Sequence, residues 1–278
     1  MMVQTVPDGE PHFISTMVEH LDFCGQIGRA FGNDTFEPID DAEALYAIDN
    51  HDRGWDDYDQ RPGLDPDTRL PYLMSQTPTD DALKTNRGSP NHNERHHPYS
   101  GLLSSMHTWG IYNRRYGFSQ FVVRTRSSIS VPVSEANKAK VEAMLAAELE
   151  RQQRLRAALV ADGGSAGRDE RRIFQNYKHL QFCDTLALYF HLRHVGERSD
   201  ETYIHVPMSR EADASITLKK VDETTYSLGP FPFGQDTVTL ACRGRYMHPV
   251  PAGQEPDDLG AVLRAHAASS QVFRLVPA

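Results

Sequence analysis

This sequence has few cysteines, no long apolar run and no excess of basic residues. Each of these features excludes a class of protein. Three cysteines occur among 278 residues, widely spaced at positions 24, 183 and 242. An odd number of scattered cysteines is typical of reduced cytosolic thiols rather than of a disulfide framework. No apolar run approaches the roughly 20 residues that span a bilayer. The sequence therefore predicts a soluble, cytoplasmic protein with no membrane partner.

The charge balance and the first residues exclude two further classes. The formal net charge is −9, whereas nucleic-acid backbones bind surfaces rich in lysine and arginine. We therefore expect no nucleic-acid partner. The opening segment MMVQTVPDGEPHFIST has neither a basic start nor an apolar core, so it is not typical of a signal peptide.

Helical spacing of apolar residues dominates the first 195 residues. A weak alternation at 2–6 and 12–16 around PDGEP predicts an N-terminal β-hairpin. Residues 17–32 repeat apolar side chains at helical spacing and end at Gly32-Asn33, which favours a helix end. Further helices are expected over 40–51, 99–117, 134–161 and 169–195, with a break at DGGSAGRD (162–169).

Residues 60–98 differ from their surroundings, being rich in Pro, Asp, Asn and Thr with few apolar anchors. Long loops inside a compact domain are commonly functional lids or disordered. This segment lies between the His51-Asp52 pair and the histidines at 97 and 107. We therefore predict a long loop that acts as a lid over the site.

Short segments with alternating or strand-like composition follow residue 200, separated by turn residues. The expected fold is mainly α, with a helical core and a small antiparallel β appendage formed by the C-terminal region and the N-terminal hairpin. The predicted domains are 1–198, the helical metal-binding part, and 199–278, the β appendage. The appendage is expected to cap the helical body or to form a homodimer surface.

Several expected helices carry a histidine or an aspartate on the face that should be buried. His20 lies four residues before Cys24 and seven before Ile27. The same helical spacing to apolar residues holds for the other members of the set, which are His51, Asp52, His107 and Asp184.

A buried unpaired carboxylate loses several kcal/mol of hydration, roughly, so it must be protonated, paired or bound to a cation. Carboxylates and neutral imidazoles that converge in one core suit one or two divalent transition-metal ions: Fe, Mn, Ni, Co or Zn. Any one of these residues alone can instead be a hydrogen-bonded core group or a helix-end residue. The order of all of them favours a metal site.

This order resembles the HD-domain superfamily, whose metal ligands follow the pattern H…HD…D, here His20, His51-Asp52 and Asp184. The chain is most similar to a bacterial family of unknown function within or near that superfamily. The likeness spans most of the first 195 residues and is carried by the segments FISTMVEHLDFCG, HDRGW, RPGLDPDTRLP, YSGLLSSMHTWGIY and QFCDTLALYF.

The resemblance implies an all-α core in which these four residues hold one metal ion. His107 would be a fifth ligand, for a second ion. Dinuclear members take two further histidines about two dozen residues apart, whereas His97 and His107 are only ten apart. His97 is a candidate ligand, and a solvated loop histidine is the equal alternative.

Because HD proteins are mostly phosphohydrolases, the resemblance implies a metal-dependent hydrolase of a small phosphorylated compound, acting through a metal-activated water. Asp52 would bridge two ions, and Gln181 would orient a ligand or the bound water. Arg53, Lys178 and Arg87 are candidate phosphate-binding residues, and Trp55 and Tyr99 are candidate pocket residues.

Two alternatives stay open. A minority of HD proteins holds two irons and uses dioxygen to cleave a C–C or C–P bond, which the extra histidines favour. A non-catalytic metal-binding sensor is the third possibility, and it predicts a coordinatively saturated site.

Overall fold

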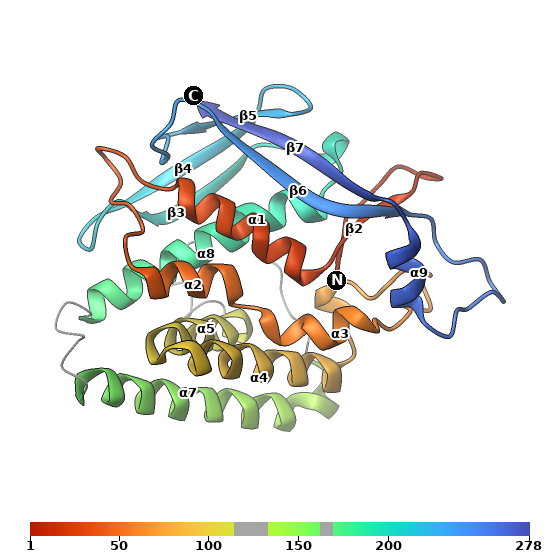
Figure 1. The fold of residues 1–278 in the computed structure, drawn as a ribbon, viewed down its shortest axis with the longest axis horizontal. Helices are drawn as coiled ribbons and strands as arrows, with labels where there is room; N and C mark the ends of the chain where they lie inside the picture. The colour runs from red at the N-terminus through yellow and green to blue at the C-terminus, as the bar shows by residue number, and fades with distance from the viewer. Residues whose placement is uncertain (114–132, 162–168) are drawn as a thin grey trace.

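The strand-like segments of the sequence pair into one large sheet. In the computed structural model, which describes residues 1–113, 133–161 and 169–278, the described strands form a single curled, mixed sheet, and about half of the chain is helical (Figure 1). The prediction of a mainly α fold with a small antiparallel appendage is therefore wrong. The short strands were recognisable one by one, but their size as a layer follows only from long-range pairing.

The sheet combines both ends of the described chain. Its order is β1-β2-β6-β7-β5-β4-β3, and all neighbours are antiparallel except β5 and β7, which run parallel. The predicted N-terminal hairpin corresponds to β1 and β2, and β2 pairs with β6. The strands are β1 (Met2–Val3), β2 (His12–Ser15), β3 (Glu201–Pro207), β4 (Asp213–Lys220), β5 (Thr225–Gly229), β6 (Val238–Met247) and β7 (Ala268–Pro277).

The predicted helices are present with slightly different bounds, and the helical layer also contains short 3-10 turns. The long helices are α1 (Met17–Ala30), α2 (Ala42–Asn50), α4 (Thr79–His96), α5 (Pro98–Tyr112), α7 (Lys138–Ala161) and α8 (Glu170–Leu192). The shorter elements are η1 (Arg53–Trp55), α3 (Asp56–Gln60), η2 (Met74–Gln76), η3 (Glu135–Asn137), η4 (Val195–Glu197) and α9 (Leu259–Ala265). The predicted break at 162–169 and the end of the predicted helix at 114–117 fall almost wholly outside the described residues.

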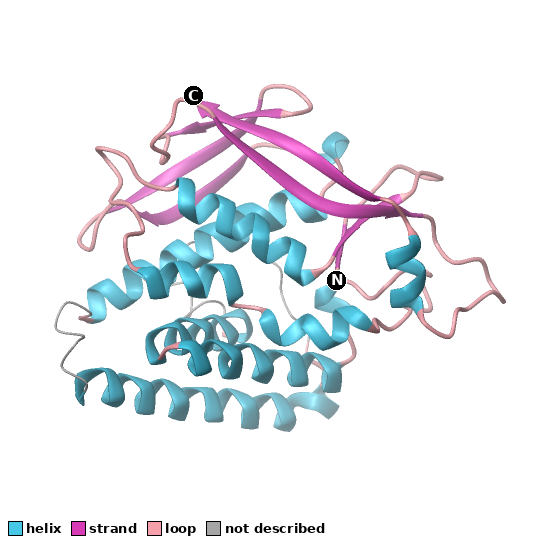
Figure 2. Cartoon of the chain, in the orientation of Figure 1, coloured by secondary structure: helices cyan, strands magenta, loops and turns pink. Residues whose placement is uncertain are grey.

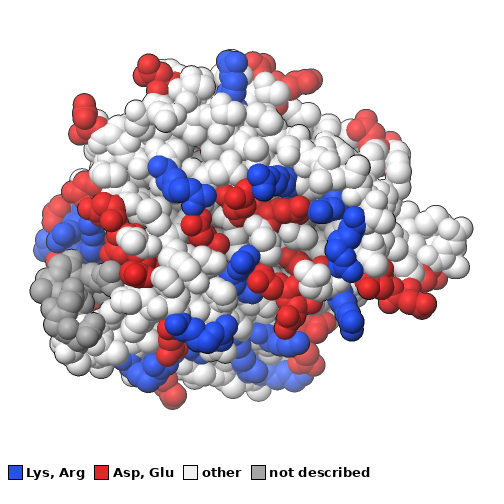
Figure 3. Space-filling model, in the orientation of Figure 1, with Lys and Arg blue, Asp and Glu red and all other residues white. Residues whose placement is uncertain are grey.

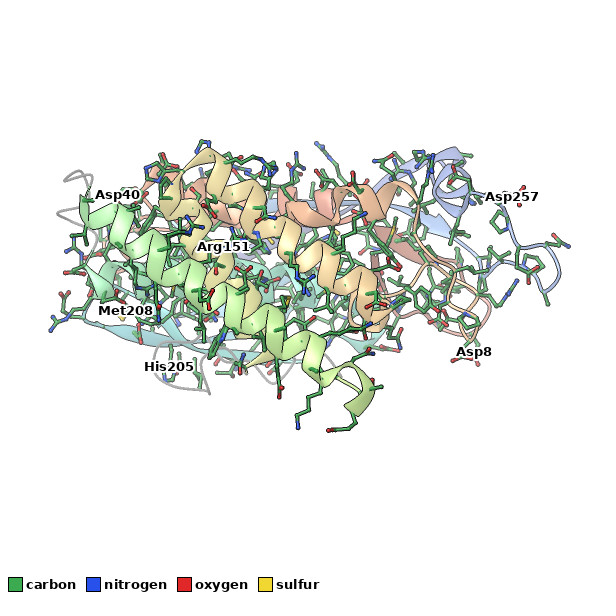
Figure 4. All side chains as sticks on the ribbon, turned by 90° about the horizontal axis from the view of Figure 1, so that it is seen from below. Asp8, Asp40, Arg151, His205, Met208 and Asp257 are labelled. Carbon is green, nitrogen blue, oxygen red and sulfur yellow. The ribbon has the colours of Figure 1, made fainter. Side chains whose placement is uncertain are left out.

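The helices are stacked in layers beneath the sheet (Figure 2). α1 and α8 pack against each other and contact β6 and β3. α2 and α5 lie below them, and α4 and α7 form the far side (Figure 1). Seen from below, α7 crosses close to α4, with Arg151 of α7 between them (Figure 4), where it pairs with Glu94 and contacts Asn91.

The hydrophobic core is continuous between the sheet and the helices. One cluster of buried side chains includes Phe23 of α1, Met106 of α5 and Phe190 of α8 together with Tyr226 of β5 and Phe273 of β7. The burial of this apolar surface is the main stabilising contribution that joins the two layers. The proposed boundary between residues 198 and 199 lies just before β3 and stays a prediction.

The prediction of a long loop over 60–98 is wrong in its second half. Thr79–His96 forms α4, an 18-residue helix that packs against α5 and η1 and contains Pro90. Much of its buried face is polar, and Asn93 donates from Nδ2 to Asn50 O at 2.7 Å. The segment therefore looks like a loop in the sequence, but tertiary contacts, among them the bond from Asn93 to Asn50 and that from Gly54 N to Ser89 Oγ, accommodate its polar face in a helix.

Charged side chains of both signs are mixed over the face in Figure 3, without a continuous patch of one sign. None of the helices in the described parts of the chain is both long and apolar enough to cross a bilayer.

Candidate metal centre

α1 begins at a fully formed capping box, which fixes where His20 lies. Thr16 Oγ1 accepts from Glu19 N, and the Glu19 carboxylate accepts from Thr16 N. Both interactions satisfy backbone N–H groups that a helix N-terminus leaves without partners. His20 follows one turn later with its ring completely buried, 3.3 Å from Asp184 Oδ1 of α8 and 3.4 Å from Cys24 Sγ.

His51 ends α2 with one ring nitrogen held by the backbone. Its Nδ1 lies 3.0 Å from Ile48 O, and since a carbonyl oxygen only accepts, Nδ1 carries the proton. Ser104 Oγ donates to His51 O and ties this helix end to α5. His51 Nε2 is buried and has no hydrogen-bond partner in the described residues, so its lone pair is available.

Asp52 and His107 lie close to His51 in the same buried region. Asp52 Oδ2 lies 3.8 Å from His51 Nε2, and Asp52 Oδ1 lies 3.9 Å from His107 Nε2 of α5. The His51 and His107 rings are 4.7 Å apart between centroids. Four elements, α1, the end of α2, α5 and α8, therefore aim nitrogen and oxygen ligands into one buried region.

Two overlapping groups of side chains could hold a metal ion. The ligand atoms of His20, Cys24 and His51 all lie within 4.8 Å of one another, and so do those of His51, Asp52 and His107. We name these groups the inner position (His20–Cys24–His51) and the outer position (His51–Asp52–His107). Imidazole, carboxylate and thiolate are transition-metal ligands, and the unpartnered His51 nitrogen fits that role.

Two residues of the region were not among the predicted site residues. Burial raises the pKa of the Cys24 thiol well above its usual range, so without a cation it stays protonated. His191 of α8 packs its ring 5.1 Å from that of His20, and burial lowers its pKa to about 3. His191 lies seven residues after Asp184, so helical spacing places both residues on the same face of α8.

A small cavity of about 30 Å³ opens beside the outer position. Asp52, His107 and Asp184 reach it from the metal centre, and the rest of its described lining is mostly apolar. That lining consists of Trp55, Met74, Ala82, Asn86, Ile111, Tyr112 and Leu188. Trp55 lies in this lining, and its pocket role stays a prediction; the described lining contains no lysine or arginine.

Three predicted site residues lie in other surroundings. His97 caps the start of α5, where its Nδ1 accepts from Tyr99 N. Ten residues of helix separate it from His107, about 15 Å along the axis, so the fold does not bring it to the centre. Tyr99 is fully buried with its hydroxyl accepting from Asn176, and Lys178 forms an ion pair with Asp213.

Arg53 and Arg87 lie in a separate surface groove. Arg53 forms an ion pair with Asp56, and the groove also contains Lys84 and Arg95. η1 and α4 line both spaces, but with different residues: Trp55 and Asn86 face the cavity, whereas Arg53 and Arg87 face the groove. Gln181 is fully buried on α8, one turn before Asp184.

Fold and site together define a mixed α/β protein with a buried His/Asp/Cys centre that could bind a metal ion. The chain belongs to the family described as protein of unknown function (DUF3891), whose model matches residues 1–249. The predicted membership of the HD-domain superfamily is wrong, because the matching family is this one and the fold contains a large mixed sheet instead of an all-α architecture. No curated protein and no solved structure matches the chain.

Proposed function

We propose that this chain is a metal-dependent hydrolase. The observation that carries the proposal is the buried convergence of His51 Nε2, which has no hydrogen-bond partner in the described residues, with the carboxylate of Asp52 and the ring of His107. A buried carboxylate must be protonated, paired or bound to a cation, and a bound cation also accounts for the unpartnered His51 nitrogen. A bound divalent ion would lower the pKa of a coordinated water and supply a hydroxide nucleophile near neutral pH.

The chain would contribute ligands, orientation and exclusion of water. His51, Asp52 and His107 would hold the ion at the edge of the cavity, and Asp184 would complete the ligand set from α8. Gln181 would act as a positioning residue, because it lies one turn before Asp184. Trp55 and Leu188 line the cavity with apolar surface, which limits the access of bulk water to a bound substrate.

Contact between the centre and the cavity supports an enzyme over a metal-binding sensor. A structural ion is commonly closed off by protein ligands, whereas a catalytic one keeps a position open. Asp52, His107 and Asp184 all reach the cavity wall, so an ion among them would have a side that faces the cavity.

A small phosphorylated compound is the substrate class to test first. The described cavity lining contains no lysine or arginine. The phosphoryl group would therefore be bound by the ion and by His107, the histidine in the described lining. Arg53 and Arg87 would not contact it, since they line the separate groove.

The test combines elemental analysis with an activity screen. Purified chain should contain one or two divalent transition-metal ions (Fe, Mn, Ni, Co or Zn), and a chelator should abolish hydrolysis of phosphate monoesters and diesters in a way that Mn²⁺ restores. Metal at stoichiometric amounts without hydrolysis of phosphoesters, carboxylic esters or amides would contradict the proposal.

Dioxygen chemistry at a two-iron centre is the second candidate. The apolar, cation-free described lining of the cavity favours it, because such a pocket also suits an uncharged organic substrate. Two irons per chain together with oxygen consumption would identify this function. Manganese-dependent hydrolysis without oxygen uptake would identify the first.

A further inference from the structure

Cys24 of α1 is a completely buried thiol that the proposed function does not use. Its Sγ atom lies 3.4 Å from His20 Nε2, and it completes the inner position with His51. The outer position, which faces the cavity, also contains His51. One histidine is therefore common to two ion positions.

His51 can serve only one of these positions at a time. An imidazole binds two ions only through both ring nitrogens. Nδ1 of His51 is committed to Ile48 O at 3.0 Å, and Nε2 holds the one available lone pair. Ions in the inner and outer positions would compete for it.

The two positions differ in chemistry and in access. The inner one offers a thiol sulfur, and its three side chains are completely buried and absent from the cavity lining. The outer one offers a carboxylate and reaches the cavity through Asp52 and His107. Thiolate ligands favour soft or borderline ions such as Zn²⁺, whereas carboxylates suit hard ions such as Mn²⁺.

We propose that Cys24 makes the inner position a thiolate site for a soft ion, and that an ion held there excludes a hard ion from the outer position. Binding forms an ion–sulfur bond and releases the thiol proton to solvent. None of the three inner side chains lines the cavity, so a soft metal held by them would occupy His51 and block catalysis by a hard one. This consequence rests on the proposed function, whereas the thiolate site itself does not.

Cobalt(II) is the probe for the thiolate ligand. Metal-free full-length chain titrated with Co²⁺ should develop sulfur-to-cobalt charge-transfer absorption in the near ultraviolet. Cys24→Ser should lose this absorption, and Cys242→Ser should keep it, because Cys242 is an equally buried thiol in the sheet. A wild-type spectrum without the absorption, or a Cys24→Ser spectrum that retains it, overturns the thiolate site.

Competition between Mn²⁺ and Cd²⁺ tests the exclusion. With Mn²⁺ bound to the wild-type chain, each equivalent of Cd²⁺ should release one Mn²⁺, measured as free Mn²⁺ by electron paramagnetic resonance. Cys24→Ser should bind Mn²⁺ as the wild type does but should need at least about 10-fold more Cd²⁺ for the same release. Simultaneous binding of both ions overturns the exclusion. A chain that shows the thiolate absorption but never binds Mn²⁺ supports the inner site and contradicts the outer site on which the hydrolase depends.

Discussion

Adjacent residues on a regular helix point about 100° apart, so His51 and Asp52 can converge only because α2 ends between them. His51 keeps helical angles (φ −57°, ψ −27°), whereas Asp52 leaves them (φ −115°, ψ 23°). This turn brings the carboxylate to 3.8 Å from His51 Nε2. The pair is thus both a helix terminus and half of the candidate metal centre.

Asp184→Asn should lower the amount of bound metal while preserving the fold. The substitution keeps the side-chain volume but removes the negative charge that faces His20 and the cavity, and we expect an affinity loss of at least about 10-fold. Elemental analysis after dialysis measures it. Asp49→Asn, which breaks only a surface ion pair with Arg29, is the matched control. Unchanged metal content in Asp184→Asn would remove this residue from the ligand set.

Acid sensitivity of the fold should depend on His179. Its ring is buried 4.9 Å from Phe31, neither nitrogen has a hydrogen-bond partner in the described residues, and burial lowers its pKa to about 3. The folded state therefore keeps it neutral while the unfolded state binds a proton below about pH 6.5. Its effect on stability is absent above pH 6.5 and becomes destabilising as pH falls toward 3, reaching on the order of 4 kcal/mol.

His179→Phe should remove this loss, so the free energy of unfolding should fall less between pH 6.5 and pH 4 than in the wild type. Urea unfolding at several pH values measures it. His248→Asn changes an exposed histidine and should retain the wild-type pH dependence. The same slope in His179→Phe and wild type would mean that other groups cause the acid sensitivity.

Helical spacing predicted which polar side chains would face the core, but not all of the ligands. His20, His107 and Asp184 are buried as expected. Cys24 shares the face of His20, yet buried cysteine is so common that periodicity alone does not identify it as a ligand. His97 is a candidate ligand by residue type alone. In the fold it caps the start of α5, a helix that carries His107 to the centre and leaves His97 about 15 Å away along the axis.

At the scale of elements, η1 approaches α4 so closely that Gly54 has no room for a side chain. A Cβ atom there would lie 2.0 Å from Thr85 O and 2.4 Å from Ser89 N. Gly54→Ala should therefore force η1 away from α4, with a loss of about 1–3 kcal/mol in the free energy of unfolding. Because Asp52 lies only two residues before this glycine, metal affinity should also fall.

Gly28→Ala is the control for that substitution. Gly28 lies inside α1, and its Cβ would meet the side chain of Ile48 of α2 at 3.4 Å. Alanine is favoured over glycine in a helix interior by roughly 0.5–1 kcal/mol. Thermal unfolding and metal content measure both variants. An equal effect of the two substitutions would show that the η1–α4 contact does not position the site.

Elements with an apolar stripe were predictable, and those without one were not. α1, α5 and α8 were found from their periodicity. Periodicity does not indicate α4, because Thr85, Ser89 and Asn93 face inward where apolar residues are usual. Ser89 Oγ accepts from Gly54 N and Asn93 donates to Asn50 O, whereas Thr85 Oγ1 donates to Ala82 O within α4. The two distant contacts exist only in the folded chain, so no local pattern could indicate them.

At the scale of the whole molecule, the sequence pattern does not indicate which strands pair with each other. β7 pairs with β6 on one side and, in parallel, with β5 on the other. β2 joins β6 across more than 220 residues of chain. Alternation identifies a strand, but it carries no information about such distant neighbours, and so the sheet was underestimated.

Phe273→Ala should reveal whether sheet and helices unfold together. Phe273 of β7 stacks on Phe190 of α8 with centroids 4.4 Å apart and is buried, whereas its neighbour Val272 is half exposed. Truncating the ring should cost about 3–5 kcal/mol, and Val272→Ala should change stability by no more than about 0.5 kcal/mol.

Both tryptophans, at 55 and 109, lie in the helical layer, so their fluorescence reports on that layer alone. Because one core joins the layers, the denaturation midpoint seen by tryptophan should fall in Phe273→Ala. A midpoint that stays at the wild-type value would mean that residues 199–278 unfold as an independent appendage.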